Sequence, residues 1–124
     1  MKITEKKLIN AGMDPTELKR FNEAYPRGLY DTPVNLQKAI DQNFDVLWMI
    51  EEGVTKPTGK IVVDGNAYYF VAGKLHRETG PAIIFACGCK RYYHRGRLHR
   101  VPGRAVILCG RRGGERWING EFIE

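Results

Sequence analysis

Hydrophobic positions in the first part of the chain recur with helical spacing, in short runs that start on clear signals. The pairs Asp14-Pro15 and Thr32-Pro33 each combine a capping side chain with a proline suited to the first helical position. Leu18, Phe21 and Tyr25 then fall three and seven residues apart, as on one helix face. The sequence therefore predicts short helices over residues 1–52, with these apolar residues forming a small core.

The second part of the chain repeats itself. Gly73-Lys-Leu-His-Arg77 and Gly96-Arg-Leu-His-Arg100 are identical at four of five positions, with a basic residue at the fifth, and Gly120-Glu-Phe122 matches in part. The leading glycines are 23 and 24 residues apart, and an aromatic residue precedes each by three positions, namely Phe70, Tyr93 and Trp117. A fixed period with matched positions indicates a structural unit that is stacked several times.

Each repeat predicts one β-hairpin, because an apolar strand, a glycine turn and an aromatic strand follow in order. We expect turns at Gly65, Gly88 and Gly113-Gly114, and six strands in an antiparallel meander over residues 60–124. Residues 53–59 would be a linker, and the helices of residues 1–52 would cap the meander, which makes an α+β fold. The expected core positions of the repeats are Phe70, Leu75, Leu98, Trp117 and Phe122.

The repeat resembles the MORN repeat, a β-hairpin of about this length with an aromatic residue a few positions before Gly-x-x-His. Gly73-x-x-His76 and Gly96-x-x-His99 carry the likeness, whereas Ile123 stands where the third histidine would be. Residues 73–82 are closer still to a Leu-His-Arg-x-x-Gly-Pro-Ala variant found in bacterial and phage proteins. Residues 8–50 resemble a short helical module of such proteins that carries no known activity. The resemblance implies a scaffold or binding module.

Charge is distributed unevenly between the two parts of the 124-residue chain. Residues 1–58 hold 8 Lys and Arg against 9 Asp and Glu, while residues 59–124 hold 12 against 5. Residues 90–116 contain nine basic side chains and a single acid, Glu115. Arginine forks bind carboxylates and phosphates, and a surface that served solubility alone would mix both signs of charge. This excess therefore favours an anionic partner.

The predicted partner contact is made by the basic residues of the second and third repeats with the aromatic side chains among them. Strand alternation would place Arg91 and Arg95 at the sheet rim beside Tyr93, and Arg97 and Arg100 are expected to be exposed. The full set is Arg91, Tyr93, His94, Arg95, Arg97, Arg100, Arg104, Arg111 and Arg112.

Histidines and cysteines suggest little chemistry of their own. His76 and His99 recur in register, which favours hydrogen bonds that tie a corner over a ligand-binding pair. Cys87, Cys89 and Cys109 lack the spacing of a zinc site, and we expect free thiols in a reduced compartment, hence the cytoplasm of a bacterial cell or host. No catalytic triad or carboxylate pair is readable. The sequence predicts no enzyme, no cofactor and no metal.

The leading hypothesis is a binding module that docks on an acidic protein or nucleoprotein through its arginine-rich face. By analogy with phage proteins that carry similar repeats, docking would inhibit a host complex such as a defence system, an anti-CRISPR role included. Direct nucleic-acid binding by the same face is the alternative, and binding to anionic lipid, which the MORN likeness implies, is a third.

Overall fold

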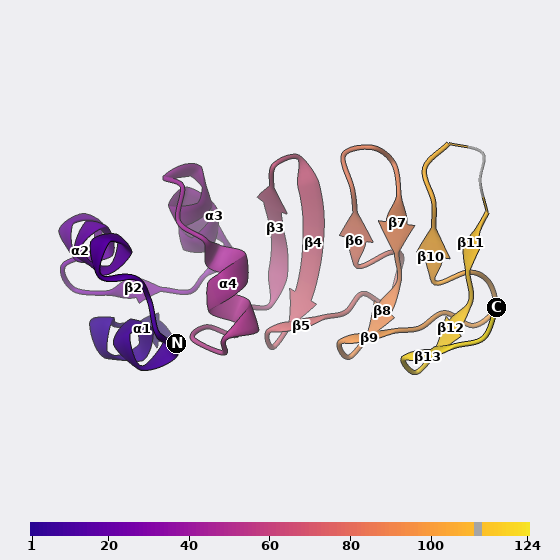
Figure 1. Ribbon diagram of the computed structural model, residues 1–124, viewed down its shortest axis with the longest axis horizontal. Coiled ribbons are helices and arrows are strands. Elements are labelled where there is room, and N and C mark those ends of the chain that lie inside the picture. Colours follow the sequence, from indigo (N-terminus) through magenta and orange to yellow (C-terminus); the bar gives the residue numbers. More distant parts are fainter. Residues whose placement is uncertain (111–112) are drawn as a thin grey trace. The chain divides into compact units, whose positions relative to one another are not determined.

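The chain forms two compact parts in the computed structural model, which describes residues 1–110 and 113–124. We call residues 1–57 the helical region and residues 58–124 the hairpin region. Together they make a mixed α+β protein whose described residues form four helices and a mostly antiparallel set of strands (Figure 1).

A side-chain cap begins each of the four helices, and the caps at Asp14 and Thr32 confirm the sequence prediction. Thr4, Asp14 and Thr32 accept hydrogen bonds from backbone N–H groups in the first turns of α1, α2 and α3, and Asp45 does so for α4. Prolines occupy the first position of α2 and α3. The helices are α1 (Glu5–Ala11), α2 (Pro15–Ala24), α3 (Pro33–Asp41) and α4 (Val46–Glu51).

The core of the helical region gathers side chains from all four helices and from a short ladder of β1 (Lys2–Ile3) and β2 (Leu29–Tyr30). Phe21 is fully buried, with ring centroids 5.2 Å from Tyr25 and 5.7 Å from Phe44. Thr55 is also fully buried, and its hydroxyl donates to the Asp31 carboxylate over 2.7 Å. Two apolar residues of the helices, Ile9 in α1 and Val34 in α3, are exposed.

Three hairpins follow one another in the main sheet of the hairpin region. They pair β3 (Gly59–Val63) with β4 (Asn66–Val71), β6 (Ile83–Ile84) with β7 (Lys90–Arg91), and β10 (Val106–Ile107) with β11 (Gly114–Glu115). Antiparallel β4–β6 and β7–β10 pairs join neighbouring hairpins. We call residues 59–81, 82–104 and 105–124 the first, second and third repeats. The three hairpins and their order confirm the sequence prediction.

The aromatic strand of the later repeats is interrupted, which the sequence did not predict. β8 (Tyr93–His94) pairs with β9 (Arg97–Leu98), and β12 (Trp117–Ile118) with β13 (Glu121–Phe122), outside the main sheet. In the first repeat, β5 (Lys74–Leu75) pairs with the continuous strand β4. The residue between β7 and β8, Tyr92, donates its N–H to Ala105 O and accepts from His99 N, so it links both ladders.

The turn prediction holds for the first two hairpins; in the third, Gly113 lies between β10 and β11 as predicted, whereas Gly114 does not. Asp64 and Gly65 both have positive φ, as a two-residue turn of the primed type requires. Gly88 lies in the second turn. Gly114, however, belongs to β11, where a Cβ atom would lie 1.8 Å from the Val106 carbonyl oxygen. This glycine is needed for close approach of two strands, not for a turn.

Burial follows the repeats less closely than predicted. Phe70 is buried, but Leu75, Leu98 and Trp117 are only half-buried, and Phe122 is 57% exposed. Leu75 and Leu98 are each followed by another repeat. The N–H of Gly96 donates to the Leu75 carbonyl oxygen, and that of Gly120 donates to the Leu98 carbonyl oxygen. Phe122 holds the equivalent place in the third repeat. The fully buried positions are instead Ile61, Ala82 and Ala105, with the buried Ile83 and Val106 next to the two alanines.

Candidate binding groove at the corners of the repeats

The segment that leads from one hairpin to the next makes the same arginine contacts in the first and second repeats. We call residues 72–80 the first corner and residues 95–103 the second corner. The guanidinium of Arg77 stacks on the Tyr69 ring at 3.9 Å, and that of Arg100 on the Tyr92 ring at 4.0 Å. Each also donates from Nη1 to a carbonyl four residues ahead, at Pro81 or Arg104. Both arginines therefore brace their own corner.

Hydrogen bonds between repeats tie each corner to the one before it. His76 Nδ1 accepts the N–H of Arg95 at 2.9 Å, and His99 Nδ1 accepts the N–H of Asn119 at 3.0 Å. The Thr58 hydroxyl accepts the N–H of Ala72 at 2.9 Å in the same manner. The three donors precede the leading glycines of the corners and share a positive φ. We call this series the corner ladder; it confirms that the recurring histidines tie corners.

The corner ladder fixes the tautomer of its two histidines. A neutral imidazole carries one proton, and a nitrogen that accepts an N–H cannot hold it. Nε2 of His76 and of His99 must therefore carry the proton and act as a donor. At His76 this donor meets Glu78 Oε1 at 2.6 Å. This hydrogen bond, with help from nearby His94 and Arg95, holds the pKa of the exposed Glu78 carboxyl below its ordinary value.

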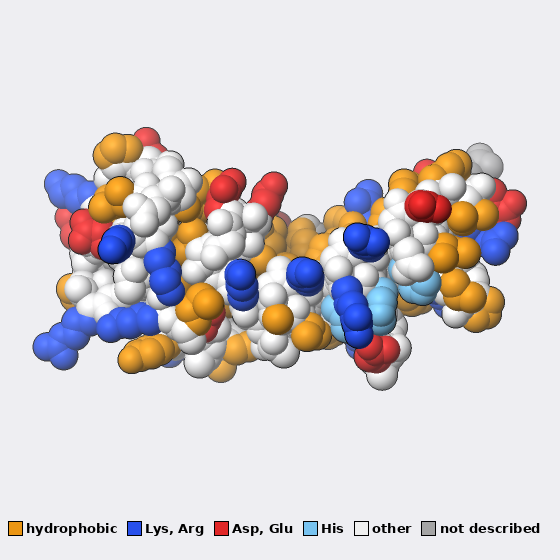
Figure 2. All heavy atoms as spheres, turned by 90° about the horizontal axis from the view of Figure 1, so that it is seen from below, with side chains coloured by type: hydrophobic (Ala, Val, Ile, Leu, Met, Phe, Trp, Pro, Cys, Tyr) orange, Lys and Arg blue, Asp and Glu red, His pale blue; other side chains and the backbone are white. Residues whose placement is uncertain are grey.

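A groove of about 660 Å³ runs between the first and second corners. Arg77 and Glu78 lie on the side of the first corner, and Arg100 on the side of the second; the other lining residues are Thr79, Gly80, Tyr92, Tyr93, His94, His99, Val101 and Pro102. The His94 ring lies between those of His76 and His99, with centroids 4.8 and 5.7 Å away. Figure 2 shows histidine side chains gathered on one face, with Lys or Arg side chains near them.

The residues predicted to contact a partner fall at several places. Tyr93, His94 and Arg100 line the groove, whereas Arg95 lines a neighbouring hollow with His76 and Glu78. Arg91 lies apart, in a hollow with Phe85, Cys87 and Cys89. Arg97 and Arg104 are exposed. Arg111 and Arg112 lie outside the described residues.

One expectation about exposure is wrong. Arg100 is half-buried against Tyr92, because its guanidinium is occupied by the stacked ring and the Arg104 carbonyl. Arg97 is exposed as expected. Its aliphatic stem would approach a Cβ at Gly120 to within 3.6–3.7 Å, so the stem covers Gly120 of the third repeat while the charged end extends into solvent. A charge reversal at Arg100 would disturb packing, and one at Arg97 would leave the backbone contacts in place.

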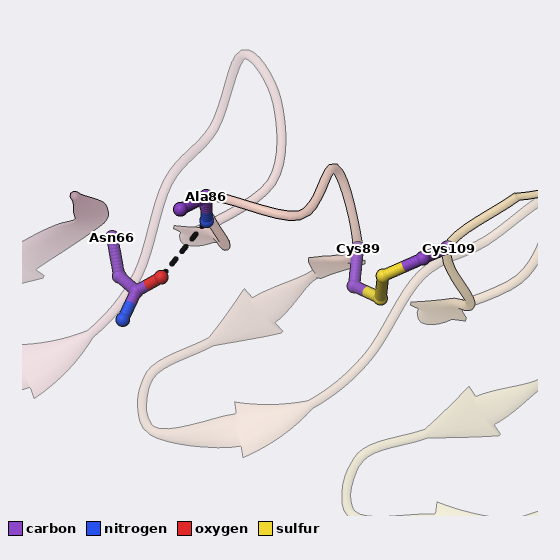
Figure 3. The surroundings of a disulfide bond; sticks show 4 residues. All are labelled: Asn66, Ala86, Cys89 and Cys109. Carbon is purple, nitrogen blue, oxygen red and sulfur yellow. Dashed lines mark hydrogen bonds between the residues drawn. A yellow bond between two sulfur atoms is a disulfide. The ribbon is translucent and has the colours of Figure 1, made fainter. Parts of the chain in front are cut away.

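The expectation of free thiols is also wrong for two of the three cysteines. Cys89 and Cys109 form a disulfide, and Cys87 is free and exposed (Figure 3). Asn66 and Ala86, each 23 residues earlier, are joined by a hydrogen bond from the Ala86 N–H to Asn66 Oδ1 at 2.8 Å. The disulfide thus links the second and third repeats at the position where a hydrogen bond links the first and second.

The His76, Glu78 and His94 side chains are close enough together to be considered as metal ligands, since their ligand atoms lie within 4.8 Å of one another. A histidine that binds a metal through one nitrogen usually donates from the other. His76 shows the reverse arrangement, because Nδ1 accepts from Arg95 and Nε2 donates to Glu78. Nε2 therefore has no lone pair for a metal, and these residues form a hydrogen-bonded cluster instead.

Reasoning from sequence missed the parts of the groove that depend on contacts between repeats. Arg77, Glu78 and Tyr92 line it but were not among the predicted contact residues. The alignment of the repeats contains the signal for Glu78, because it follows His76 by two positions and Val101 follows His99 by two. A polar residue in one repeat and an apolar one in the next marks a place where the corners differ chemically.

Comparison of the chain with protein-family models, with curated proteins and with solved structures finds no match in any of the three. Among the described residues, every helix is too short, and too poor in continuous apolar sequence, to cross a membrane. The arguments for a function therefore come from the geometry of the corners and their charge.

Proposed function

We propose that this chain is a non-enzymatic binding module that docks on an acidic partner through the basic residues of its hairpin region. The observation that carries the proposal is the set of exposed arginines that form no ion pair with a carboxylate of the described residues. In the described part of the hairpin region, the ion pairs are His76–Glu78 and Arg116–Glu124. Arg91, Arg95, Arg97 and Arg104 are exposed and take no part in them. Unpaired charges of one sign create a potential that attracts and orients an anionic partner.

The repeated architecture supports binding over catalysis. The corners hold their arginines and histidines by hydrogen bonds and stacking, so the surface between them is organised before any partner arrives. The resemblance to MORN repeats points the same way. That resemblance is also the sole support for a finer proposal, that docking inhibits a host complex by covering its acidic surface.

The proposed function is tested by reversing charge at two exposed sites. Arg95→Glu with Arg97→Glu should weaken binding to an acidic protein at least tenfold and leave the melting temperature within a few degrees. A matched control, Lys6→Glu with Lys19→Glu, makes the same change of net charge at exposed positions of the helical region. Equal weakening by both double variants would show an unspecific charge effect and would contradict the proposal.

Titration with salt separates protein from nucleic acid as the partner. Binding to DNA releases condensed counterions, so the logarithm of its affinity falls linearly and steeply with the logarithm of salt concentration. We expect the module to bind an acidic protein with a shallower dependence, and to bind single- and double-stranded oligonucleotides weakly at physiological salt. Tight oligonucleotide binding that the arginine reversals abolish would establish the alternative instead. Flotation with anionic vesicles checks lipid binding.

A further inference from the structure

One difference between the first and second corners determines whether the proton on histidine Nε2 has an acceptor within the chain. Glu78 follows His76 by two residues, and its carboxylate accepts from His76 Nε2. Val101 follows His99 by two residues and offers no side-chain acceptor. The two corners share the histidine contact to the next repeat and the arginine stacked on tyrosine. The second corner thus lacks the carboxylate that the first corner supplies to its histidine.

The proton on His99 Nε2 is consequently available to a ligand. Nδ1 of His99 accepts from Asn119, which places the proton on Nε2, and no described residue is found to accept it. Within the described part of the chain, no buried side-chain nitrogen or oxygen lacks a hydrogen-bond partner, so this nitrogen must reach solvent. His99 and Val101 both line the groove of about 660 Å³. The groove is therefore lined by a histidine whose donor is open to solvent or to a ligand.

Resting on the proposed function and making it specific, we propose that the groove binds a carboxylate side chain from an acidic segment of the partner protein. This carboxylate takes the place at His99 that Glu78 takes at His76. Arg77 and Arg100 lie on either side of the groove, and each keeps N–H donors beyond the one it uses within its corner. Val101 and Pro102 offer apolar contact to the methylene stem of a glutamate. The second corner thus recognises an acidic residue.

A carboxylate fits this site better than a phosphate group does. The structure already contains the proposed contact once, between a carboxylate and a histidine of identical tautomer, over 2.6 Å. Glu78 also lines the groove. Its negative charge repels a phosphate dianion more than a carboxylate monoanion.

Substitution at Val101 tests the proposal without altering the histidine. Val101 is 64% exposed, so its replacement does not disturb the core. Val101→Glu should place a carboxylate on His99 from within the chain and exclude the external one. Using fluorescence anisotropy with a labelled peptide that alternates glutamate and serine, we expect at least tenfold weaker binding. Val101→Gln, of the same size but neutral, should stay within about threefold of wild type.

Two further variants test the direction of the effect. His99→Asn keeps an acceptor near the Nδ1 position for Asn119 and removes the Nε2 donor. It should therefore weaken peptide binding about tenfold and leave the melting temperature close to that of the wild type. Glu78→Gln removes the negative charge from the groove and should tighten binding about threefold. A cation site would respond in the opposite way, with weaker binding after Glu78→Gln. Long-range proton–nitrogen correlation spectra should show the proton of free His99 on Nε2, with a shift on addition of peptide.

The outcomes separate this inference from the proposed function. If wild-type protein fails to bind the glutamate peptide or any acidic protein, the proposed function is wrong, and this inference with it. If the peptide binds and the Arg95 and Arg97 reversals abolish binding, but Val101→Glu equals Val101→Gln, the inference alone is wrong. Competition experiments give a further test, with the matched glutamine peptide as the neutral control. If inorganic phosphate or an oligothymidine displaces the labelled peptide and free glutamate does not, the groove prefers phosphate and the inference is wrong. A proton on His99 Nδ1 would remove its basis.

Discussion

The helical region and the hairpin region reach a folded state by different means. In the helical region, side chains far apart in sequence meet in one core, as Phe21 and Phe44 do. In the hairpin region, each repeat makes its bonds to the next, through the corner ladder and through strand pairs such as β7–β10. A single core leaves little freedom for its residues, whereas a stack of repeats fixes only the contacts between neighbours. The exposed corner positions are consequently free to carry charge.

The largest effect should come from the core of the helical region. Phe21→Ala removes a fully buried ring between Tyr25 and Phe44, and should lower the free energy of unfolding by about 3–5 kcal/mol. Denaturation with urea, followed by far-ultraviolet circular dichroism, measures the loss. Because the core is shared, all four helices should lose amide protection together in hydrogen exchange. Selective loss of protection in α2 alone would show that the region does not depend on one core.

In the hairpin region the corresponding effect should come from the disulfide. Cys89 and Cys109 close a loop with a sequence separation of 20. Reduction of a disulfide that closes a loop of this length lowers the free energy of unfolding by about 3 kcal/mol. Melting with and without a phosphine reductant should show the loss. Amide protection should fall in the second and third repeats and stay unchanged in the helical region. An unaltered melting curve after verified reduction would contradict the prediction.

A smaller effect is expected from the buried hydrogen bond of the helical region. Burial opposes ionisation of Asp31, but hydrogen bonds from Thr55 and the N-terminal ammonium group outweigh it and hold the pKa of this carboxyl below its ordinary value. A depressed folded-state pKa stabilises the protein above the ordinary aspartate pKa, and this contribution is lost as pH falls through the depressed value.

Thr55→Val removes the hydroxyl and should cost about 1.5–3 kcal/mol at neutral pH. The difference between variant and wild type should shrink in acid, as the carboxyl becomes protonated. Urea titrations at a series of pH values give both quantities. A difference that stays constant down to the acid range would mean that the hydroxyl stabilises the region by packing alone.

The smallest effect should distinguish an inner repeat from the last one. Leu98→Ala truncates a half-buried side chain that another repeat follows, and should cost about 1–2 kcal/mol. Phe122→Ala truncates the equivalent side chain, which is 57% exposed, and should cost less than about 0.5 kcal/mol. Equal losses would show that burial by the following repeat does not determine the contribution of this position.

Local signals predicted the helices well, and the period predicted the order of hairpins. Capping at Asp14-Pro15 depends on residues next to each other, so sequence alone contains it. The repeat spacing predicted Gly65 and Gly88 as turn residues for the same reason. Burial at Phe122 could not be predicted from equivalence, because equivalent residues have different neighbours in the last repeat.

The groove was predictable only in part. The sequence placed Tyr93, His94 and Arg100 in a contact set, but it also expected Arg100 to be exposed. Its stacking on Tyr92 depends on the fold of the corner, which the sequence does not state. The disulfide was missed because cysteine spacing was judged against zinc sites. Comparison of Cys89 and Cys109 with Asn66 and Ala86 requires knowledge of which residues face each other across two repeats.

The corner ladder also has a consequence for how such a chain can change in evolution. Thr58 and the two histidines each offer one acceptor to the corner that follows, but Ile123 offers none. An in-frame duplication of residues 77–99 would insert a segment directly after His76. The N–H of its Arg95 would find the His76 acceptor, and its own His99 would offer an acceptor to the next corner. Gene duplication could therefore lengthen the array by whole periods without new complementary mutations, and would copy Val101-type or Glu78-type corners according to which segment was duplicated. The number of carboxylate-binding corners would then change in whole steps, by one corner with each duplication that copies Val101.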